Sequence, residues 1–478
     1  MQPFGNNKKA HFIGLCGAGM SAVAHLLDEV GYEISGSDQG VYDPIKSYLE
    51  KCNLTCSVPH NPTNIPNNVD TIVIGRHAKL VPESNAEVAR AFEKFPNNIK
   101  SFPEVLGEIT QDTQNFVIAG SYGKSTTTAL LTWAMQQLHL DPGYFIGALP
   151  IDFEYTSGVG GGKYFVLEGD EYPSSNWDNT SKFLHYHASS VLLISGEHDH
   201  VNVFPTLEEY LAPYQQLMRA LPQGGYVVGC IDNPHVAELM SQSQAKGVSY
   251  GFDPRADFTI SDIQHEGALT HFQIMHLGKS LGTFSTQLLG KHNVQNICGV
   301  VAFMLTHGLC NAQDLVAPLR AFRGITRRLD RKSDIASIHI YEGFGSSYTK
   351  ARTAITALQE HFPDQKLFVL FEPHTFSWRN RQSLDWYHTV FDGVDTVALY
   401  PPPGHGATSH DQLSHKEIID EVKAHFRGKV LSVCDFDSIT ETLKNNLQAR
   451  DVLLILTSGS FDGKIAEIVG WCENNFIR

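Results

Sequence analysis

The stretch Gly120-Ser121-Tyr122-Gly123-Lys124-Ser125-Thr126 lies between an apolar run, Phe116 to Ala119, and a helical pattern that begins at Lys124. A glycine-rich turn between a buried strand and a helix places main-chain N–H groups where they can bind phosphate oxygens. Lys124 can reach the β- and γ-phosphates of a nucleotide, and the hydroxyl of Ser125 or Thr126 can be a ligand of Mg²⁺. We therefore predict that this loop binds ATP.

The spacing of this loop leaves an alternative open. Only two residues separate its glycines, whereas the common phosphate-binding signature has four, so a glycine-rich turn with an incidental lysine would look the same. Acidic and histidine residues further along the chain favour the nucleotide interpretation, because a metal–nucleotide site requires them.

These residues follow two later apolar runs. Val166 to Leu167 precedes Glu168-Gly169-Asp170-Glu171, and Val191 to Ser195 precedes Gly196-Glu197-His198-Asp199-His200. The carboxyl ends of parallel strands meet at one edge of an α/β sheet, where ligands bind. We predict that Glu168 binds Mg²⁺ and that His200 or Asp199 holds a second divalent ion or orients the first. Solvated loops and helix caps are the alternative for either cluster alone.

Composition limits the classes of function. A chain of 478 residues is long enough for about three domains. With 36 Lys and Arg against 51 Asp and Glu, the net charge of −15 argues against nonspecific binding to nucleic acid. No apolar run approaches the ~18 residues of a membrane span, and the eight cysteines are scattered without the spacing of a zinc site. We expect a cytoplasmic protein with neither a nucleic-acid nor a membrane partner.

Strands and helices alternate in three blocks, which predicts an α/β fold of three consecutive open-sheet domains with bounds 1–107, 108–323 and 324–478. Pro96 to Pro103 is expected to be a linker. Two helices are expected at about Met20 to Val30 and from near His292. The expected strands are His11 to Leu15, Tyr32 to Gly36, Thr71 to Ile74, Phe116 to Ala119, Tyr164 to Leu167, Val191 to Ile194, Ile338 to Tyr341, Leu367 to Phe371, Thr396 to Tyr400 and Val452 to Leu456.

The first block carries a second glycine turn, Gly14-Leu15-Cys16-Gly17-Ala18-Gly19, with Asp38 at the end of the next strand. The order of the glycines differs from the dinucleotide fingerprint, so NAD is not specifically indicated. Glycine still permits a diphosphate to approach a helix N-terminus closely, although a purely structural turn is the alternative. The candidate substrate-binding residues are Gly17, Gly19, Met20, Ser21, Ser37 and Asp38.

Taken in order, the phosphate loop, the acidic strand end, the Asp-His pair and Gly290-Lys291-His292-Asn293-Val294-Gln295-Asn296 resemble the ATPase elements of the Mur ligases of peptidoglycan synthesis. The resemblance covers nearly the whole chain and implies ATP and Mg²⁺ as cofactors. It implies that His292 lies at the nucleotide and that Asn293 and Asn296 contact the adenine. It also implies that Arg327, in the hinge Phe322 to Leu329, meets the nucleotide phosphates, although a solvated hinge arginine is the alternative.

The same resemblance implies that the first domain is Rossmann-like and binds a UDP-sugar, that the central domain binds ATP, and that the Rossmann-like third domain binds the incoming amine or peptide. Three segments are similar to the branch of the family that joins the tripeptide L-Ala-γ-D-Glu-meso-diaminopimelate to UDP-N-acetylmuramate: Val41 to Pro44, Pro142 to Gly147 and Ser181 to Tyr186. Phe371 to Phe376 is closer to the branch that adds L-alanine.

The reaction implied by the resemblance starts with a carboxylate, which ATP phosphorylates to an acyl phosphate before an amine attacks. Lys124, Glu168 and His200 are the residues expected to carry it, with Ser125, Glu168 and His200 as metal ligands. Tyr341 to Tyr348 stands where relatives have acidic and histidine residues, so no role is assigned there. A noncatalytic regulator that binds a nucleotide sugar and a nicotinamide oxidoreductase are the alternatives from other classes, and a monomer or weak homo-oligomer is expected.

Overall fold

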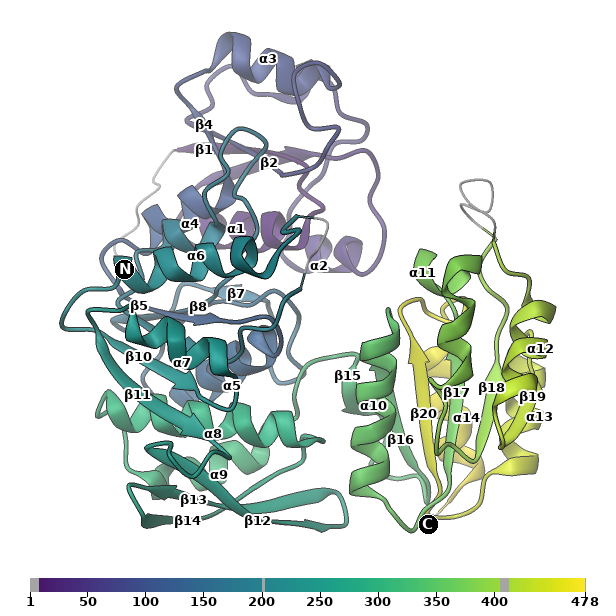
Figure 1. The fold of residues 1–478 in the computed structure, drawn as a ribbon. Helices are drawn as coiled ribbons and strands as arrows, with labels where there is room; N and C mark the ends of the chain where they lie inside the picture. The colour runs from purple at the N-terminus through teal and green to yellow at the C-terminus, as the bar shows by residue number, and fades with distance from the viewer. Residues whose placement is uncertain (1–7, 200–202, 405–411, 478) are drawn as a thin grey trace. The chain divides into compact units, whose positions relative to one another are not determined.

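The computed structural model describes residues 8–199, 203–404 and 412–477, and it contains three β-sheets (Figure 1). The chain divides into two compact units. The first comprises Met1–Gln264, His271–Thr286 and Val294–Phe322, and the second comprises His265–Thr270, Gln287–Asn293 and Arg323–Arg478. Among the described helices, none combines the length and the apolar character that crossing a bilayer requires.

The first sheet has four parallel strands in the order β2-β1-β3-β4. Helices α1 and α4 pack on one face through Val23 and Val105, and α3 packs on the other through Val88. The elements are β1 Lys9–Ile13, α1 Ala18–Glu29, β2 Glu33–Ser37, α2 Ile45–Lys51, the 3₁₀ turn η1 Pro62–Asn64, β3 Thr71–Ile74, α3 Ala86–Lys94, β4 Ile99–Lys100 and α4 Phe102–Ile109.

The second sheet has ten strands in the order β14-β13-β12-β11-β10-β9-β5-β8-β6-β7. Strands β8, β5, β9 and β10 run parallel at its centre, so that their carboxyl ends share one edge. The strands are β5 Gln114–Ala119, β6 Gly143–Phe145, β7 Ser157–Gly158, β8 Tyr164–Glu168, β9 Ser190–Leu193, β10 Tyr226–Cys230, β11 Lys246–Gly251, β12 Phe258–Glu266, β13 Leu269–His276 and β14 Lys279–Thr286. The helices of this part are α5 Lys124–Gln137, the 3₁₀ turn η2 Lys182–Tyr186, α6 Leu207–Ala220, α7 Pro234–Ser241, α8 Lys291–Thr306 and α9 Ala312–Ala321.

The third sheet has six strands in the order β15-β16-β20-β17-β18-β19, all parallel except for the edge strand β15. Helices α10 and α12 contribute Ile355 and Ile418 to the core on one face, and α13 and α14 contribute Ile439 and Ile468 to the core on the other. The elements are β15 Arg328–Arg331, β16 His339–Phe344, α10 Tyr348–His361, β17 Leu367–Glu372, α11 Phe376–Arg379, the 3₁₀ segment η3 Arg381–His388, β18 Thr396–Leu399, α12 His415–His425, β19 Lys429–Ser432, α13 Phe436–Asn446, β20 Val452–Thr457 and α14 Ile465–Asn475.

The predicted α/β class with three sheets is confirmed, and every strand expected from the sequence overlaps a strand of the structure. The expected linker at Pro96 to Pro103 is wrong, because this segment holds β4 and the start of α4. Ser101 and Glu104 form a capping box there, and a proline is tolerated in the first turn of a helix. The expected domain boundaries after residues 107 and 323 remain predictions.

Candidate functional site

The phosphate loop joins β5 to α5, as its sequence predicts. Gly120 has a φ of +143° and Gly123 a φ of +80°, conformations that side chains with a Cβ rarely adopt. A Cβ at Gly120 would lie 2.8 Å from the main-chain nitrogen of Ser195, and a Cβ at Gly123 would lie 3.2 Å from both amide atoms of Asn296. Both glycines are therefore required by backbone conformation and by close packing.

Two hydrogen bonds hold this loop to the segment that follows β9. The Ser121 hydroxyl donates to the carbonyl oxygen of Glu197 over 2.5 Å, and the N–H of Tyr122 donates to the Ser195 hydroxyl over 3.0 Å. Burial and the carboxylates of Asp199 and Glu197 raise the pKa of Tyr122, so its phenol stays neutral. The phosphate loop is therefore in contact with the segment after β9 at one edge of the sheet.

Lys124 is the first residue of α5, and its ammonium group is already held in place. Its Nζ donates to the carbonyl oxygen of Gly120 over 2.7 Å and to Oε2 of Glu171 over 2.9 Å. The Glu171 side chain is fully buried, and its Oε1 accepts a hydrogen bond from the Tyr210 hydroxyl over 3.3 Å. Burial and the Glu171 carboxylate raise the pKa of Tyr210, which keeps that hydroxyl a donor. The loop thus carries a positioned cation that is only 14% exposed.

An oxygen-rich pair lies beside this cation. The Ser125 hydroxyl donates to Oε1 of Glu168 over 2.8 Å, and Oε2 of Glu168 accepts from the N–H of Gly147 over 2.6 Å. Thr126, the other hydroxyl considered for the metal, is buried in the first turn of α5. A hydroxyl and a carboxylate are oxygen ligands of the kind that Mg²⁺ takes, so the residues present fit that ion.

A second ion pair involves Asp170, which lies two residues after Glu168 in the sequence. Nζ of Lys182 donates to Oδ2 of Asp170 over 2.6 Å, and it lies 5.2 Å from the centre of the Phe102 ring and 5.8 Å from that of Tyr172. Burial alone would raise the pKa of Asp170, but the Lys182 ammonium outweighs burial and lowers it. The carboxylate is therefore charged, and the pair links the end of β8 to η2.

The segment after β9 is described only in part. His200, the predicted metal ligand, lies outside the described residues. His198 is in the described part. Its Nε2–H donates to the carbonyl oxygen of Phe204 over 2.8 Å, so this ring is bound to the main chain of the same segment.

The residues expected at the nucleotide base fall in two places. Asn296 packs against Gly123 of the phosphate loop. His292 and Asn293 belong to the segment Gln287–Asn293 of the second compact unit. There, Nδ2 of Asn293 donates to the carbonyl oxygen of Leu289 over 2.7 Å, and the His292 side chain is exposed.

Arg327 also belongs to the second unit, where it has a φ of +66°. Its Nε lies 3.2 Å from Oε1 of Glu342, its Nη2 donates to the carbonyl oxygen of Gly459, and its guanidinium group lies 5.2 Å from the centre of the Phe344 ring. Glu342 therefore pairs with an arginine, which is a contact that the sequence did not reveal.

The glycine turn after β1 is closed by Asp38. Its Oδ2 accepts from the N–H of Cys16 over 2.9 Å, and Gly14, with a φ of +88°, donates to the carbonyl oxygen of Ser37 over 2.9 Å. Gly17 caps α1, and a Cβ at Gly19 would lie 3.0 Å from the Phe102 ring.

The remaining residues expected at this turn have contacts inside the protein. Met20 is buried, and the Ser21 hydroxyl donates to the carbonyl oxygen of Ala18. The Ser37 hydroxyl donates to Oε2 of Glu87 over 2.9 Å. In this arrangement Asp38 shapes the turn, while the side chain of Ser37 faces the interior.

Glu87 is buried behind the turn and was not predicted from the sequence. Its Oε1 lies 2.8 Å from Nε2 of His11, and its Oε2 lies 3.5 Å from Nδ1 of His60. Burial alone would raise its pKa, but hydrogen bonds from His11, His60 and Ser37 lower the pKa of Glu87 to about 2. A buried charge thus supports the first strand pair, and no sequence signal marked it.

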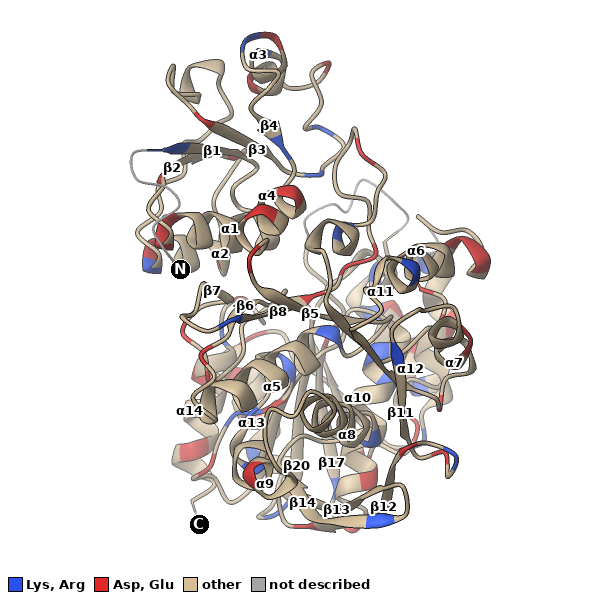
Figure 2. Ribbon diagram, turned by 90° about the vertical axis from the view of Figure 1, so that its left-hand side faces the viewer, with Lys and Arg blue, Asp and Glu red and all other residues tan. Residues whose placement is uncertain are grey.

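Positions of basic and of acidic residues are interspersed along the ribbon (Figure 2). The cations at this candidate site are therefore local ones, held by particular acidic partners. Glu171, the partner of Lys124, could have been found from the sequence, because it lies three residues after Glu168 in the same acidic string.

Known proteins match this chain over most of its length. The model of the Mur ligase middle domain matches residues 118–304, and the model of the Mur ligase family, catalytic domain, matches residues 9–114. The UDP-N-acetylmuramate–L-alanine ligase of Desulforapulum autotrophicum is 27% identical over 455 residues, which cover 95% of this chain and 96% of that protein.

Two solved structures share the fold over nearly the whole chain. The murein peptide ligase of Psychrobacter arcticus has a TM-score of 0.65 at 22% identity and covers 98% of this chain and 99% of its own. The UDP-N-acetylmuramate–alanine ligase of Thermotoga maritima has a TM-score of 0.75 at 22% identity and covers 97% and 98%. With both family models matched in order and the phosphate loop in place, the chain belongs to the Mur ligase family of ATP-dependent amide-bond ligases.

Proposed function

We propose that this ligase joins the tripeptide L-Ala-γ-D-Glu-meso-diaminopimelate to UDP-N-acetylmuramate, the role of a murein peptide ligase, and that it does so in the cytoplasm. ATP would transfer its γ-phosphoryl group to the lactyl carboxylate, which forms an acyl phosphate and ADP. The peptide amine would then attack the acyl carbon, so that phosphate leaves, an amide bond forms and the amine loses a proton.

The support for the ATP half of this proposal is the pair of contacts at the start of α5. Lys124 would exchange its contacts with Gly120 and Glu171 for the nucleotide phosphates, since its ammonium group already lies at the loop. Ser125 and Glu168 would hold Mg²⁺, and His200 would complete a second metal position. A magnesium ion at that position supplies positive charge that offsets the charge of the transferring phosphoryl group.

One observation carries the choice of the tripeptide. The segment Ser181 to Tyr186, which resembles the tripeptide-adding branch, forms η2, and its Lys182 pairs with Asp170 at the end of β8. This brings the branch-specific segment to the same sheet edge as Glu168. Lys182 would exchange its contact with Asp170 for a carboxylate of the tripeptide, which is rich in such groups.

L-Alanine is the second candidate for the incoming amine. Relatives named UDP-N-acetylmuramate–L-alanine ligase match nearly the whole chain at 27% identity. Phe371 to Phe376, at the end of β17, is also closer to that branch.

The test offers the purified protein Mg-ATP and UDP-N-acetylmuramate with either the tripeptide or L-alanine. ADP release and product mass are measured together. We expect a product with the mass of the tripeptide adduct. An alanine adduct alone would support the second candidate, and no ADP release with either amine would contradict both.

Two matched variants sharpen this assay. Lys182→Met is expected to lower tripeptide-dependent ADP release, whereas Lys163→Met, at the opposite end of β8, is expected to leave it unchanged.

His200→Ala is expected to raise the Mg²⁺ concentration needed for half-maximal rate, and an unchanged Mg²⁺ titration would remove His200 from the site.

A further inference from the structure

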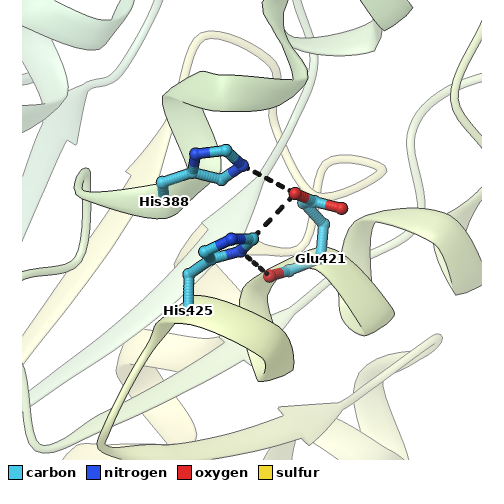
Figure 3. Close-up of side chains that lie close together, drawn as sticks. All are labelled: His388, Glu421 and His425. Carbon is cyan, nitrogen blue, oxygen red and sulfur yellow. Dashed lines mark hydrogen bonds and ion pairs between the residues drawn. The ribbon is translucent and has the colours of Figure 1, made fainter.

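Two histidines and a glutamate meet in the C-terminal part of the chain, within the second compact unit (Figure 3). His388 ends η3, while Glu421 and His425 lie one turn apart on α12. Nε2 of His388 lies 2.6 Å from Oε1 of Glu421, and Nδ1 of His425 lies 3.5 Å from the same oxygen. One ligand atom from each residue can be chosen so that all three lie within 4.8 Å of one another.

These donors match the preference of a particular class of ion. Two imidazoles and one carboxylate are suited to Zn²⁺ and similar first-row ions, whereas Mg²⁺ prefers oxygen ligands alone. Ligands of a tetrahedral zinc ion stand about 3.4 Å apart, given metal–ligand distances near 2.1 Å. The distance from Nδ1 of His425 to Oε1 of Glu421 already fits this value, but this nitrogen also lies 3.1 Å from the Glu421 carbonyl oxygen and would have to give up that contact. His388 would have to withdraw from Glu421 by about 0.8 Å.

The arrangement of the rings also favours a ligand set. The two imidazole rings are stacked, with centroids 3.8 Å apart and planes inclined by 25°. Neutral imidazole is the form that binds metal ions, and the stacking holds the two rings side by side. The three side chains are between 23% and 41% exposed, which leaves room for an ion and water to reach them.

A simple clasp between η3 and α12 is the competing explanation. The contact between Nη2 of Arg381 and Oε1 of Glu417, at 2.7 Å, already joins these two elements one turn earlier on α12. The docking of η3 therefore has its own ion pair, and it does not require two stacked histidines in addition.

We propose that His388, Glu421 and His425 bind one divalent transition-metal ion, with Zn²⁺ as the reference ion and water in the remaining coordination position. This site would share neither residues nor donor type with the oxygen ligands Ser125 and Glu168, since its three residues all belong to the second unit. The bound ion would fasten η3 to α12.

The test uses the full-length protein without a histidine tag, in excess Mg²⁺ so that oxygen-based sites are occupied. Zn²⁺ is titrated in competition with a chromogenic chelator. We expect one tight site per chain, with a Kd that rises at least tenfold in His388→Asn and in His425→Gln. The control His139→Asn removes an exposed imidazole at a φ of +58°, a conformation that asparagine tolerates, and should leave the Kd unchanged.

Binding of Co²⁺ gives a second readout, because its visible absorption reports the nitrogen and oxygen donors directly. The proposal is overturned if His388→Asn binds Zn²⁺ as tightly as the unchanged protein, or if His139→Asn weakens binding equally. If His425→Gln fails to fold, Glu421→Gln serves as the second variant. It keeps an acceptor for His388 but removes the charge that the metal requires. An unchanged Kd for Zn²⁺ in Glu421→Gln would also overturn the proposal.

Discussion

Replacing Lys124 by methionine should damage the protein in two separable ways. The substitution removes the ammonium group proposed to bind the nucleotide, and it also takes from the buried Glu171 carboxylate its cation at 2.9 Å. Removing one partner of a buried ion pair costs about 3–5 kcal/mol. The Tyr210 hydroxyl still donates to Glu171, so we expect a value near the lower end, about 3 kcal/mol.

The double variant Lys124→Met/Glu171→Gln separates the two effects. Glutamine keeps an acceptor for Tyr210 but carries no charge, so most of the lost stability should return. ADP release should remain absent in both variants, because neither has the cation. The double variant is therefore stable and inactive, whereas the single variant is unstable and inactive.

Hydrogen exchange of the amides of α5 is the suitable assay, because a chain with several domains does not give one unfolding free energy. A loss of about 3 kcal/mol corresponds to exchange more than 100-fold faster, at roughly 1.4 kcal/mol for each factor of ten. Equal exchange rates in the single and double variants would refute the argument that Glu171 depends on Lys124 for its burial as a charged group.

Glu168→Gln weakens the acceptor of the Ser125 hydroxyl. We expect the rate of ADP release to fall about 100-fold, with partial recovery at high Mg²⁺. An unaffected rate would contradict the assignment of Glu168 as a metal ligand. Gly123→Ala places a Cβ at a φ of +80° beside Asn296, so calorimetry should show weaker ATP binding than in the control Gly308→Ala, which has a similar φ and open space around it. Because the folded-state pKa of Glu87, about 2, lies below its ordinary value near 4.3, its stabilisation is complete above about pH 4.3 and is lost as the pH falls toward 2. Glu87→Gln should flatten the dependence of the thermal midpoint on pH in that range, and an unchanged slope would count against this account.

The central parallel strands were predictable because they are buried on both faces and read as apolar runs. β3 and β17 are examples, since every residue of both strands is buried. The phosphate loop was predictable because a short string, Gly120 to Thr126, contains all of its conformational requirements.

Other elements had no comparable signal. β13 buries only alternate residues, one of which is Thr270, so it does not read as a continuous apolar run. β4 has only two residues, and it lies in a segment whose prolines suggested a linker.

The contacts of the site were harder to predict than its residues. That Lys124 pairs with Glu171 and that Ser37 faces Glu87 depends on side-chain directions set by tertiary packing, which sequence spacing does not encode. The string Gly196 to His200 indicated the correct sheet edge, since its Glu197 accepts a hydrogen bond from the phosphate loop.

The short strand β7 ends the ten-stranded sheet, and α1 packs against it. The Ser157 hydroxyl donates to the carbonyl oxygen of Ala22 over 2.8 Å, and the N–H of Val159 donates to Oε2 of Glu29 over 2.9 Å. A shortened polypeptide that starts at residue 108 would lack this cover and would present an open strand edge to other molecules. Such a fragment should self-associate during expression, because an uncovered strand edge can pair with other chains. The N-terminal residues that precede position 108 therefore protect the ten-stranded sheet from aggregation.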